Sequence, residues 1–481
     1  MSKQNSITLT ILGGGKEIGA NSYLLDWKGT RIVLDCGLDI TKGGFETLPN
    51  FDILGKLEVD AAIISHSHID HVGSLPILID TYLQRGHRVH VTVPSRRLIP
   101  LMLADSAKMQ ENVYLPAEDH YYEWCLDRES VASMFYRRNV FAAHNYGEKF
   151  RLSPDLYASF FPSGHILGAA GIVISDGKHT FIYTGDICKH DQTIHPGCML
   201  PTVSDTDFLL IESTRGSVES DPNRDRPGQL RLLAAEITET LNRGGHALLP
   251  SFALGKTQEL IITLANMKMD GFIPAGAPVL YHQGLTTAVN KVYNTFSEFL
   301  TGFDPAIFRT ACRKVTAFTN GDEFRSAWEL TDRPSIFVFT SGMASRGSPS
   351  ARLAEELIQT ENSGIFFTSY IAPEEFGYEL ATVETGDYVQ PDLKSDRRVK
   401  VNCRHRRRFS LSSHSMRDDL LQIADHFNPK VSVWVHGEPS STQWLSTGFS
   451  GHHPEAVSLQ PVSGETIDLT DGGKTIGHPD K

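Results

Sequence analysis

The sequence predicts an α/β protein with more than one domain. Its 481 residues exceed the usual domain length of roughly 100–200 residues. Short apolar runs alternate with longer stretches of helical periodicity, which is typical of α/β chains. A hydrophobic share of 40% and a charged share of 21% indicate a folded globular chain and exclude a disordered one.

The short apolar runs predict buried strands that each end in a polar loop. In the first run, residues 7–11, Ile and Leu alternate with Thr. Runs at 31–35, 61–65 and 207–211 follow, and each is too short for a helix. Polar residues that follow such strands are candidates for a functional site.

Two longer stretches, 96–111 and 227–243, predict helices. In the second, Leu and Ile recur at helical spacing, Pro227 lies near the start and two glycines follow the end. A strand at 246–250 and a further helix from about Gly255 continue the alternation.

Composition narrows the class of protein. No run approaches the roughly 18 apolar residues of a membrane span, and the N-terminus lacks the apolar core of a signal peptide. Six scattered cysteines with no CxxC pair argue against a disulfide framework and predict a reducing, cytoplasmic setting. A net charge of −12 argues against nonspecific coating of nucleic acid but leaves room for a locally basic groove.

A histidine-rich segment follows the predicted strand at 61–65. His66, His68, Asp70 and His71 lie within six residues, so a tight loop would bring them together. Imidazole and carboxylate side chains suit zinc and similar divalent metals. The alternative is a polar surface loop, which we disfavour because a buried strand leads straight into the segment.

Further ligand candidates follow other predicted strands. His165, Asp186 and His436 each come after a strand-like run. The loops that leave one end of the strands of an α/β sheet meet at one site. Asp35 also ends a strand, and a carboxylate there suits a residue that orients a metal ligand.

These residues resemble the metallo-β-lactamase superfamily, whose HxHxDH signature matches residues 66–71. The resemblance implies an αββα sandwich that binds two Zn²⁺ per chain, with Mn²⁺ as the second candidate. It implies that one ion is held by His66, His68 and His165, that the other is held by Asp70, His71 and His436, and that Asp186 bridges them. Asp35 would match the strand-end aspartate of the family. Two ions about 3.5–4 Å apart leave open positions for a bridging hydroxide and a substrate oxygen.

Three later segments resemble motifs A, B and C of the β-CASP nucleases, a branch that includes bacterial ribonucleases J and the pre-mRNA 3′-end endonuclease. Glu212 ends a strand in LLIESTRG, His414 lies in LSSHS, and Gly-Glu-Pro follows His436. In one departure from the family, the residues after His414 are Ser415–Met416 instead of a pair such as Ala-Asp, so a carboxylate that would support this loop is missing.

The β-CASP resemblance covers nearly the whole chain and implies its domain organisation. An α/β β-CASP domain at 213–400 would be inserted into the metallo-β-lactamase domain, whose two parts would be 1–212 and 401–481. The short stretches before and after these motifs predict a minimal version of the fold.

The expected function is hydrolysis of RNA phosphodiester bonds, with single-stranded DNA as the second candidate substrate. The bridging hydroxide would be the nucleophile, with Asp70 in the catalytic set. His414 would be the general acid, and Glu212 would keep it protonated, since a nearby carboxylate raises a histidine pKa. The competing functions are a small-molecule hydrolase acting on thioesters or lactones and a non-catalytic nucleic-acid-binding paralogue. Endonuclease and exonuclease modes both remain open.

Three segments are candidates for contact with the phosphates of RNA or another single-stranded nucleic acid. Ser341 and Gly342 follow a predicted strand and would offer backbone amides, while Lys256 begins a helix. The run 397–408 carries seven Lys or Arg, and as a strand it would put Arg404, Arg406 and Arg408 on one face. The plainer interpretations are that Ser341 and Gly342 form a tight turn and that the run 397–408 is a solvated edge. We expect no membrane partner, and a homodimer is a candidate assembly.

Overall fold

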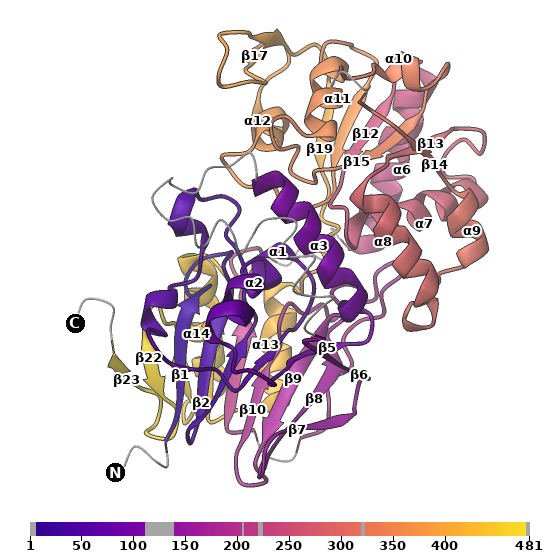
Figure 1. Cartoon of the computed structure of the whole chain (residues 1–481). Coiled ribbons are helices and arrows are strands. Elements are labelled where there is room, and N and C mark those ends of the chain that lie inside the picture. The colour runs from indigo at the N-terminus through magenta and orange to yellow at the C-terminus, as the bar shows by residue number, and fades with distance from the viewer. Residues whose placement is uncertain (1–5, 111–138, 204–205, 220–224, 319–322, 478–481) are drawn as a thin grey trace. The chain divides into compact units, whose positions relative to one another are not determined.

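A computed structural model of the chain describes residues 6–110, 139–203, 206–219, 225–318 and 323–477 (Figure 1). The chain divides into two compact units. The first unit comprises residues 1–191, 197–220 and 413–481, and the second comprises residues 192–196 and 221–412. Each unit contains both helices and strands, which confirms the α/β prediction.

Two sheets form the centre of the first unit. The eight-stranded sheet has the order β23-β22-β1-β2-β3-β4-β5-β6. Its strands are β1 (Ile7–Gly13), β2 (Ser22–Trp27), β3 (Thr30–Leu34), β4 (Ala61–Ile63), β5 (Val89–Thr92), β6 (Phe141–His144), β22 (Thr466–Asp468) and β23 (Lys474–Gly477). The seven-stranded sheet has the order β21-β20-β11-β10-β9-β8-β7. Its strands are β7 (Lys149–Ser153), β8 (Leu156–Pro162), β9 (Ala170–Ser175), β10 (Thr180–Tyr183), β11 (Phe208–Glu212), β20 (Val431–Val435) and β21 (Val457–Leu459).

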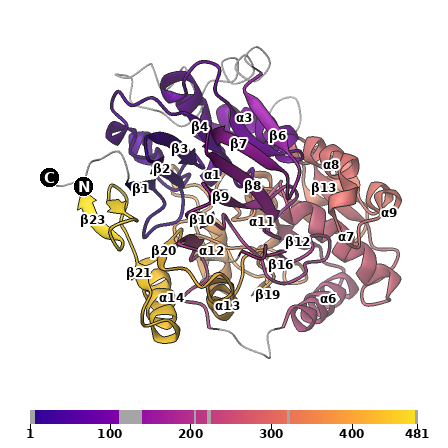
Figure 2. The same ribbon diagram turned by 90° about the horizontal axis from the view of Figure 1, so that it is seen from below.

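An apolar core fills the space between these two sheets. Alternate residues of facing strands supply it, among them Leu9 and Ile11 of β1 and Ile172 and Ile174 of β9. The outer face of the eight-stranded sheet packs on α1 (Ile69–Val72), α2 (Leu75–Ile77), η4 (Leu78–Tyr82) and α3 (Ser95–Gln110), with η2 (Gly44–Thr47) and η3 (Phe51–Ile53) nearby in the chain. Helices α13 (Arg417–Phe427) and α14 (Pro439–His452) cover the other sheet, on the opposite side of the unit (Figure 2). The unit is therefore the predicted αββα sandwich.

The strands that carry the predicted site residues run parallel. In one sheet β3 pairs with β4, and in the other β11 pairs with β10 and β20. Asp35 follows β3 with φ +57° and His436 follows β20 with φ +50°. Non-glycine residues rarely adopt this left-handed conformation, and it turns the chain sharply at each strand end.

The second unit is built on a six-stranded parallel sheet with the order β14-β13-β15-β12-β16-β19. Its strands are β12 (Ala247–Pro250), β13 (Val279–His282), β14 (Arg313–Val315), β15 (Ile336–Phe339), β16 (Gly364–Phe367) and β19 (His405–Arg408). A small antiparallel pair consists of β17 (Tyr388–Val389) and β18 (Val399–Lys400). Part of the basic run is thus a strand, β19, at the edge of the sheet.

Helices connect the strands of the second unit. They are α6 (Arg226–Asn242), α7 (Lys256–Met269), α8 (Leu285–Thr295), η6 (Ser297–Phe299), α9 (Pro305–Thr310), α10 (Ala327–Leu330), α11 (Pro349–Leu357) and α12 (Phe376–Thr382). The predicted boundaries of α6 are confirmed within a residue or two. Asp225 caps its start by accepting a hydrogen bond from Gly228 N, and Gly244 follows its end with φ +82°. Among the described residues of both units, no helix combines the length and apolarity needed to cross a membrane.

Candidate metal centre

Histidine and aspartate side chains converge at one edge of the first unit. Two four-residue groups of candidate ligands form there, and Asp186 also forms a third, smaller group with Glu212 and His414. Within each group the ligand atoms lie within 4.8 Å of one another. The first group is His66, His68, His165 and Asp186. The second group is Asp70, His71, His436 and Asp186. All seven residues that the sequence nominated are thus brought together, and Asp186 belongs to both groups.

The first group joins the end of β4 to loops of the other sheet. His68 Nδ1 lies 3.1 Å from both His66 Nε2 and His165 Nε2. Asp186 Oδ2 lies 3.5 Å from His66 Nε2 and 3.6 Å from His165 Nε2. Three imidazole nitrogens and one carboxylate oxygen at such spacings form a donor set that suits a zinc-like ion.

The second group faces the other oxygen of Asp186. Asp186 Oδ1 lies 3.3 Å from His71 Nε2 and 3.0 Å from His436 Nδ1, and Asp70 Oδ2 lies 3.4 Å from His436 Nε2. Asp186 Oδ1 and His436 Nε2 are nevertheless buried without a hydrogen bond of normal geometry to any described residue. Buried polar atoms are rarely left unpaired, so the donor set fits a metal ion.

Charge in the cluster also fits a cation. Burial lowers the pKa of His66 and His165 well below the usual histidine value, which keeps their nitrogen lone pairs available. Burial also disfavours charge on His436, but the facing carboxylates of Asp186 and Asp70 outweigh it and raise its pKa to about 10. The two carboxylates therefore attract positive charge, which protons or a divalent ion can supply.

Asp35 orients one histidine from each group. It is fully buried, and His71 Nδ1 donates to its Oδ2 at 2.7 Å. The hydroxyl of Ser65 donates to the same oxygen at 2.6 Å and lies 3.1 Å from His66 Nδ1. Tyr183 OH also donates to Asp35 Oδ2 at 2.6 Å. These bonds fix the tautomers so that Nε2 of His66 and of His71 faces the cluster.

His414 and Glu212 form a pair beside the cluster. His414 Nδ1 lies 3.1 Å from both carboxylate oxygens of Glu212, and His414 Nε2 lies 3.9 Å from Asp186 Oδ2. Burial alone would lower the pKa of His414, but the charges of Glu212 and then Asp186 outweigh it and raise that pKa. The ring thus has one nitrogen bound to Glu212 and a second nitrogen directed toward the cluster.

Sequence reasoning missed several polar residues that support the site. Asn21 Nδ2 donates to Asp70 O at 3.1 Å and lies 3.2 Å from His71 Nε2. Thr214 Oγ1 lies 3.2 Å from His436 Nδ1, and Thr214 N donates to Glu212 Oε2. Ser65 and Tyr183 act through Asp35. Ser65 directly precedes His66 and Thr214 lies two residues after Glu212, so their place in the motifs is the one sequence signal that could have found them.

The structure gives Lys256 a structural role. Its side chain is buried, and Nζ donates to Glu259 Oε2 at 2.8 Å and to the carbonyl oxygen of Leu411 at 2.6 Å. A lysine held in this way neutralises a buried carboxylate at the start of α7. Phosphate contact at Lys256 stays a prediction that now competes with this role.

The turn after β15 is internally hydrogen-bonded. Ser341 Oγ donates to Ser345 Oγ at 3.1 Å and accepts from Ser345 N at 2.9 Å. A side chain at Gly342 would bring a Cβ within 2.9 Å of Phe252 N, so the tight packing requires glycine. Phosphate binding at this turn stays a prediction.

The three arginines of the predicted basic face have different surroundings. Arg406 is half-buried and donates to the carbonyl oxygens of Cys403 and Leu380, at 2.9 Å in each case. Arg404 and Arg408 are exposed, and the Arg408 guanidinium lies 5.8 Å from the ring centre of Tyr378. The face is therefore less uniform than the alternation of a strand predicted.

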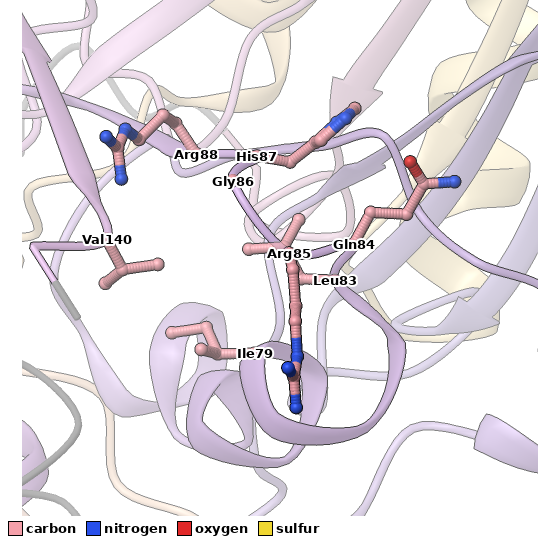
Figure 3. Close-up of a pocket in the computed structure, with 8 residues that line it drawn as sticks. All are labelled: Ile79, Leu83, Gln84, Arg85, Gly86, His87, Arg88 and Val140. Atoms are coloured by element: carbon pink, nitrogen blue, oxygen red, sulfur yellow. The ribbon is translucent and has the colours of Figure 1, made fainter.

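A surface cavity of about 330 Å³ lies elsewhere in the first unit (Figure 3). Its lining consists of Ile79, Leu83, Gln84, Arg85, Gly86, His87, Arg88 and Val140. None of the predicted site residues lines it. The histidine–aspartate cluster and this cavity are therefore separate features of the first unit.

Comparisons with known families agree with this geometry. Three family models match this chain. The metallo-β-lactamase superfamily matches residues 15–220, the β-CASP domain matches residues 257–380, and the Zn-dependent metallo-hydrolase RNA specificity domain matches residues 398–453. The metallo-β-lactamase match, together with the His/Asp cluster, indicates a site for divalent metal.

Two curated proteins and one solved structure are similar to the chain along most of its length. The transcription termination factor FttA of Methanothermobacter thermautotrophicus is 30% identical, over 96% of this chain and 71% of that protein. RNase aCSPSF2 of Saccharolobus solfataricus is 27% identical, over 97% of this chain and 86% of that protein. A crystal structure of a protein of unknown function from Enterococcus faecalis V583 aligns with a TM-score of 0.55 and 15% identity, over 96% of this chain and 99% of that one. This last likeness concerns the fold alone.

Proposed function

Because the chain belongs to the β-CASP branch of the metallo-β-lactamase superfamily, we propose that it is a metal-dependent nuclease that hydrolyses phosphodiester bonds of RNA. One observation carries the proposal: two ligand groups share Asp186 and lie beside the Glu212–His414 pair. A relative named RNase and the match to an RNA specificity domain support RNA as the substrate.

The proposed centre holds two Zn²⁺, with Mn²⁺ as the second candidate, because imidazole suits zinc and carboxylate suits both ions. His66, His68 and His165 would hold one ion, and Asp70, His71 and His436 the other, with Asp186 between them. Bound divalent ions would activate a water molecule as the nucleophile and neutralise charge on the phosphate. Asp35 would keep His66 and His71 in the tautomer that leaves Nε2 free for a metal.

His414 would donate a proton from Nε2 to the oxygen that leaves the phosphate. Glu212 accepts from Nδ1, so it fixes the ring and stabilises its protonated form. Glu212 itself accepts hydrogen bonds from the backbone N–H groups of Ile187 and Thr214, which hold its carboxylate in place. This pair favours a phosphodiesterase over a hydrolase of thioesters, because a thiolate leaves without such a proton donor.

A parallel assay tests the proposal. Labelled single-stranded RNA, single-stranded DNA and a chromogenic lactone are incubated with the protein in zinc or manganese and again with a chelator. We expect metal-dependent cleavage of RNA and no hydrolysis of the lactone. Lactone hydrolysis without RNA cleavage would establish the small-molecule enzyme, and RNA binding without cleavage by the metal-loaded protein would establish the non-catalytic paralogue.

A further inference from the structure

The loop that carries His414 is attached to its surroundings on both sides. Ahead of His414, the carbonyl oxygen of Ser413 accepts a hydrogen bond from His165 Nδ1 at 2.9 Å. Behind it, Ser415 is fully buried and donates its backbone N–H to Ile187 O at 2.8 Å. The hydroxyl of Ser415 also accepts from the backbone N–H of Lys189 at 2.9 Å. Ser415 thus makes two bonds to the segment that follows Asp186.

The same segment is bonded to Glu212. The backbone N–H of Ile187 donates to Glu212 Oε1 at 2.7 Å, while the carbonyl oxygen of Ile187 accepts from Ser415. Glu212 and Ser415 therefore hold Ile187 from its two main-chain groups. Since Ser415 adjoins His414, these bonds set the position of the His414 backbone relative to the carboxylate that its ring contacts.

A carboxylate one turn further along reinforces this attachment. The Asp419 carboxylate lies near the backbone N–H of Met416, the residue before α13. Its Oδ2 also lies 2.6 Å from His190 Nε2, and its Oδ1 lies 3.7 Å from Lys189 Nζ. Asp419 thereby supplies from within α13 a carboxylate that the sequence lacks at Met416.

We propose that Ser415 and Asp419 are positioning residues for His414, and that they act by clamping the start of α13 to residues 187–190. The inference deepens the proposed function and rests on it. A proton donor must reach the leaving oxygen within hydrogen-bond distance, and a displacement of about 1 Å is enough to slow a reaction by roughly 100-fold. Neither residue contacts the ligand cluster. Removing either side chain should therefore shift the position of the His414 ring and leave the metal site intact.

The test compares Ser415→Ala and Asp419→Ala with Ser432→Ala. Ser432 is equally buried and hydrogen-bonded in the same unit, but its hydroxyl contacts Val457 O and Ser458. We expect Ser415→Ala to lower kcat on RNA roughly ten- to hundredfold with unchanged KM and metal content. Hydrolysis of bis(4-nitrophenyl) phosphate, whose leaving group needs no proton, should change by less than about twofold. Ser432→Ala should change neither.

Hydrogen–deuterium exchange provides a readout that does not depend on activity. In Ser415→Ala, backbone amides of residues 187–190 should exchange faster, because the bond from Lys189 N is lost. Equal losses on both substrates, or unchanged exchange in this segment, would overturn the proposal. If the wild-type protein cleaves no RNA, the proposed function fails, and exchange alone decides whether Ser415 holds the loop.

Discussion

The ligand cluster of the first unit and the basic edge strand of the second are both rich in charged residues. They differ in whether those charges have hydrogen-bond and ion-pair partners. In the cluster, buried carboxylates and imidazoles face one another, and Asp186 Oδ1 and His436 Nε2 have no hydrogen bond of normal geometry within the described part of the chain. On β19, Arg406 is bonded to backbone carbonyls and Arg407 donates to Glu236 Oε1 at 2.9 Å. Buried polar atoms without a partner among the described residues indicate a site for a ligand, whereas charges paired with local partners indicate a structural role.

The first way to test this contrast is Asp186→Ala, for which we expect the largest effect. Asp186 belongs to both four-residue ligand groups, so its loss should lower metal content from the proposed two ions per chain toward zero and abolish cleavage of RNA. Elemental analysis and an RNA assay measure the two effects. Asp176→Ala is the matched control, because Asp176 pairs with Lys28 in the same unit and lies outside both ligand groups. Full metal occupancy in Asp186→Ala would contradict the proposed bridging role of Asp186.

A second variant separates binding from chemistry within the cluster. His414→Ala should retain its metal and its RNA affinity but cleave RNA about 10²–10⁴-fold more slowly, the range that general acid catalysis contributes. The loss should be much smaller on a nitrophenyl phosphodiester. His452→Ala, in an exposed pair with Asp425, serves as the control and should behave like wild type. A loss of metal in His414→Ala would make this residue a ligand instead of a proton donor.

A third variant tests Asp35, the buried carboxylate that orients two of the candidate ligand histidines. Asp35→Asn keeps the size of the side chain but removes the charge that His71, Ser65 and Tyr183 face. We expect metal affinity to fall about 10–100-fold, because mutating the hydrogen-bond partner of a metal-binding histidine typically lowers metal affinity by this factor. Competition with a chromogenic chelator measures the affinity. Tyr183→Phe removes a single donor to Asp35 and should weaken metal binding much less, so equal effects of the two changes would argue against a special role for the carboxylate.

The sequence predicted the cluster well because its ligands are rare residue types that follow recognisable strands. His66, His165, Asp186 and His436 stood out for this reason, and all follow strands of the first unit. Ser415 escaped notice as a support, because serine is common in loops and its two bonds depend on residues over two hundred positions away.

The basic candidates were harder to interpret because sequence shows a charge without showing its partner. By sequence Lys256 is a candidate for phosphate contact, although Glu259 lies three residues later on the same helix, at the spacing of an ion pair. For Arg406, the partners are carbonyl groups of the backbone, which carry no sequence signal at all. Alternation along a strand predicts which face a side chain occupies, but not whether that face is solvated.

The last and smallest expected effect concerns the basic edge strand itself. Arg406→Gln should lower the free energy of unfolding by about 1–2 kcal/mol, because it removes the donors that face Cys403 and Leu380. It should leave the salt dependence of RNA binding unchanged. Arg404 and Arg408 are exposed, so changing both to Gln should leave stability nearly unchanged.

If the exposed pair contacts phosphates, the double change should also alter RNA binding. Each lost contact to a single strand reduces the log–log salt slope by about 0.7, so the expected decrease is about 1.4. Fluorescence anisotropy at several salt concentrations measures the slope, and Arg406→Gln serves as the matched control. An unchanged slope in the double variant would make β19 a solvated edge whose charges prevent strand pairing. A slope that changes only in Arg406→Gln would reverse our division between structural and exposed arginines.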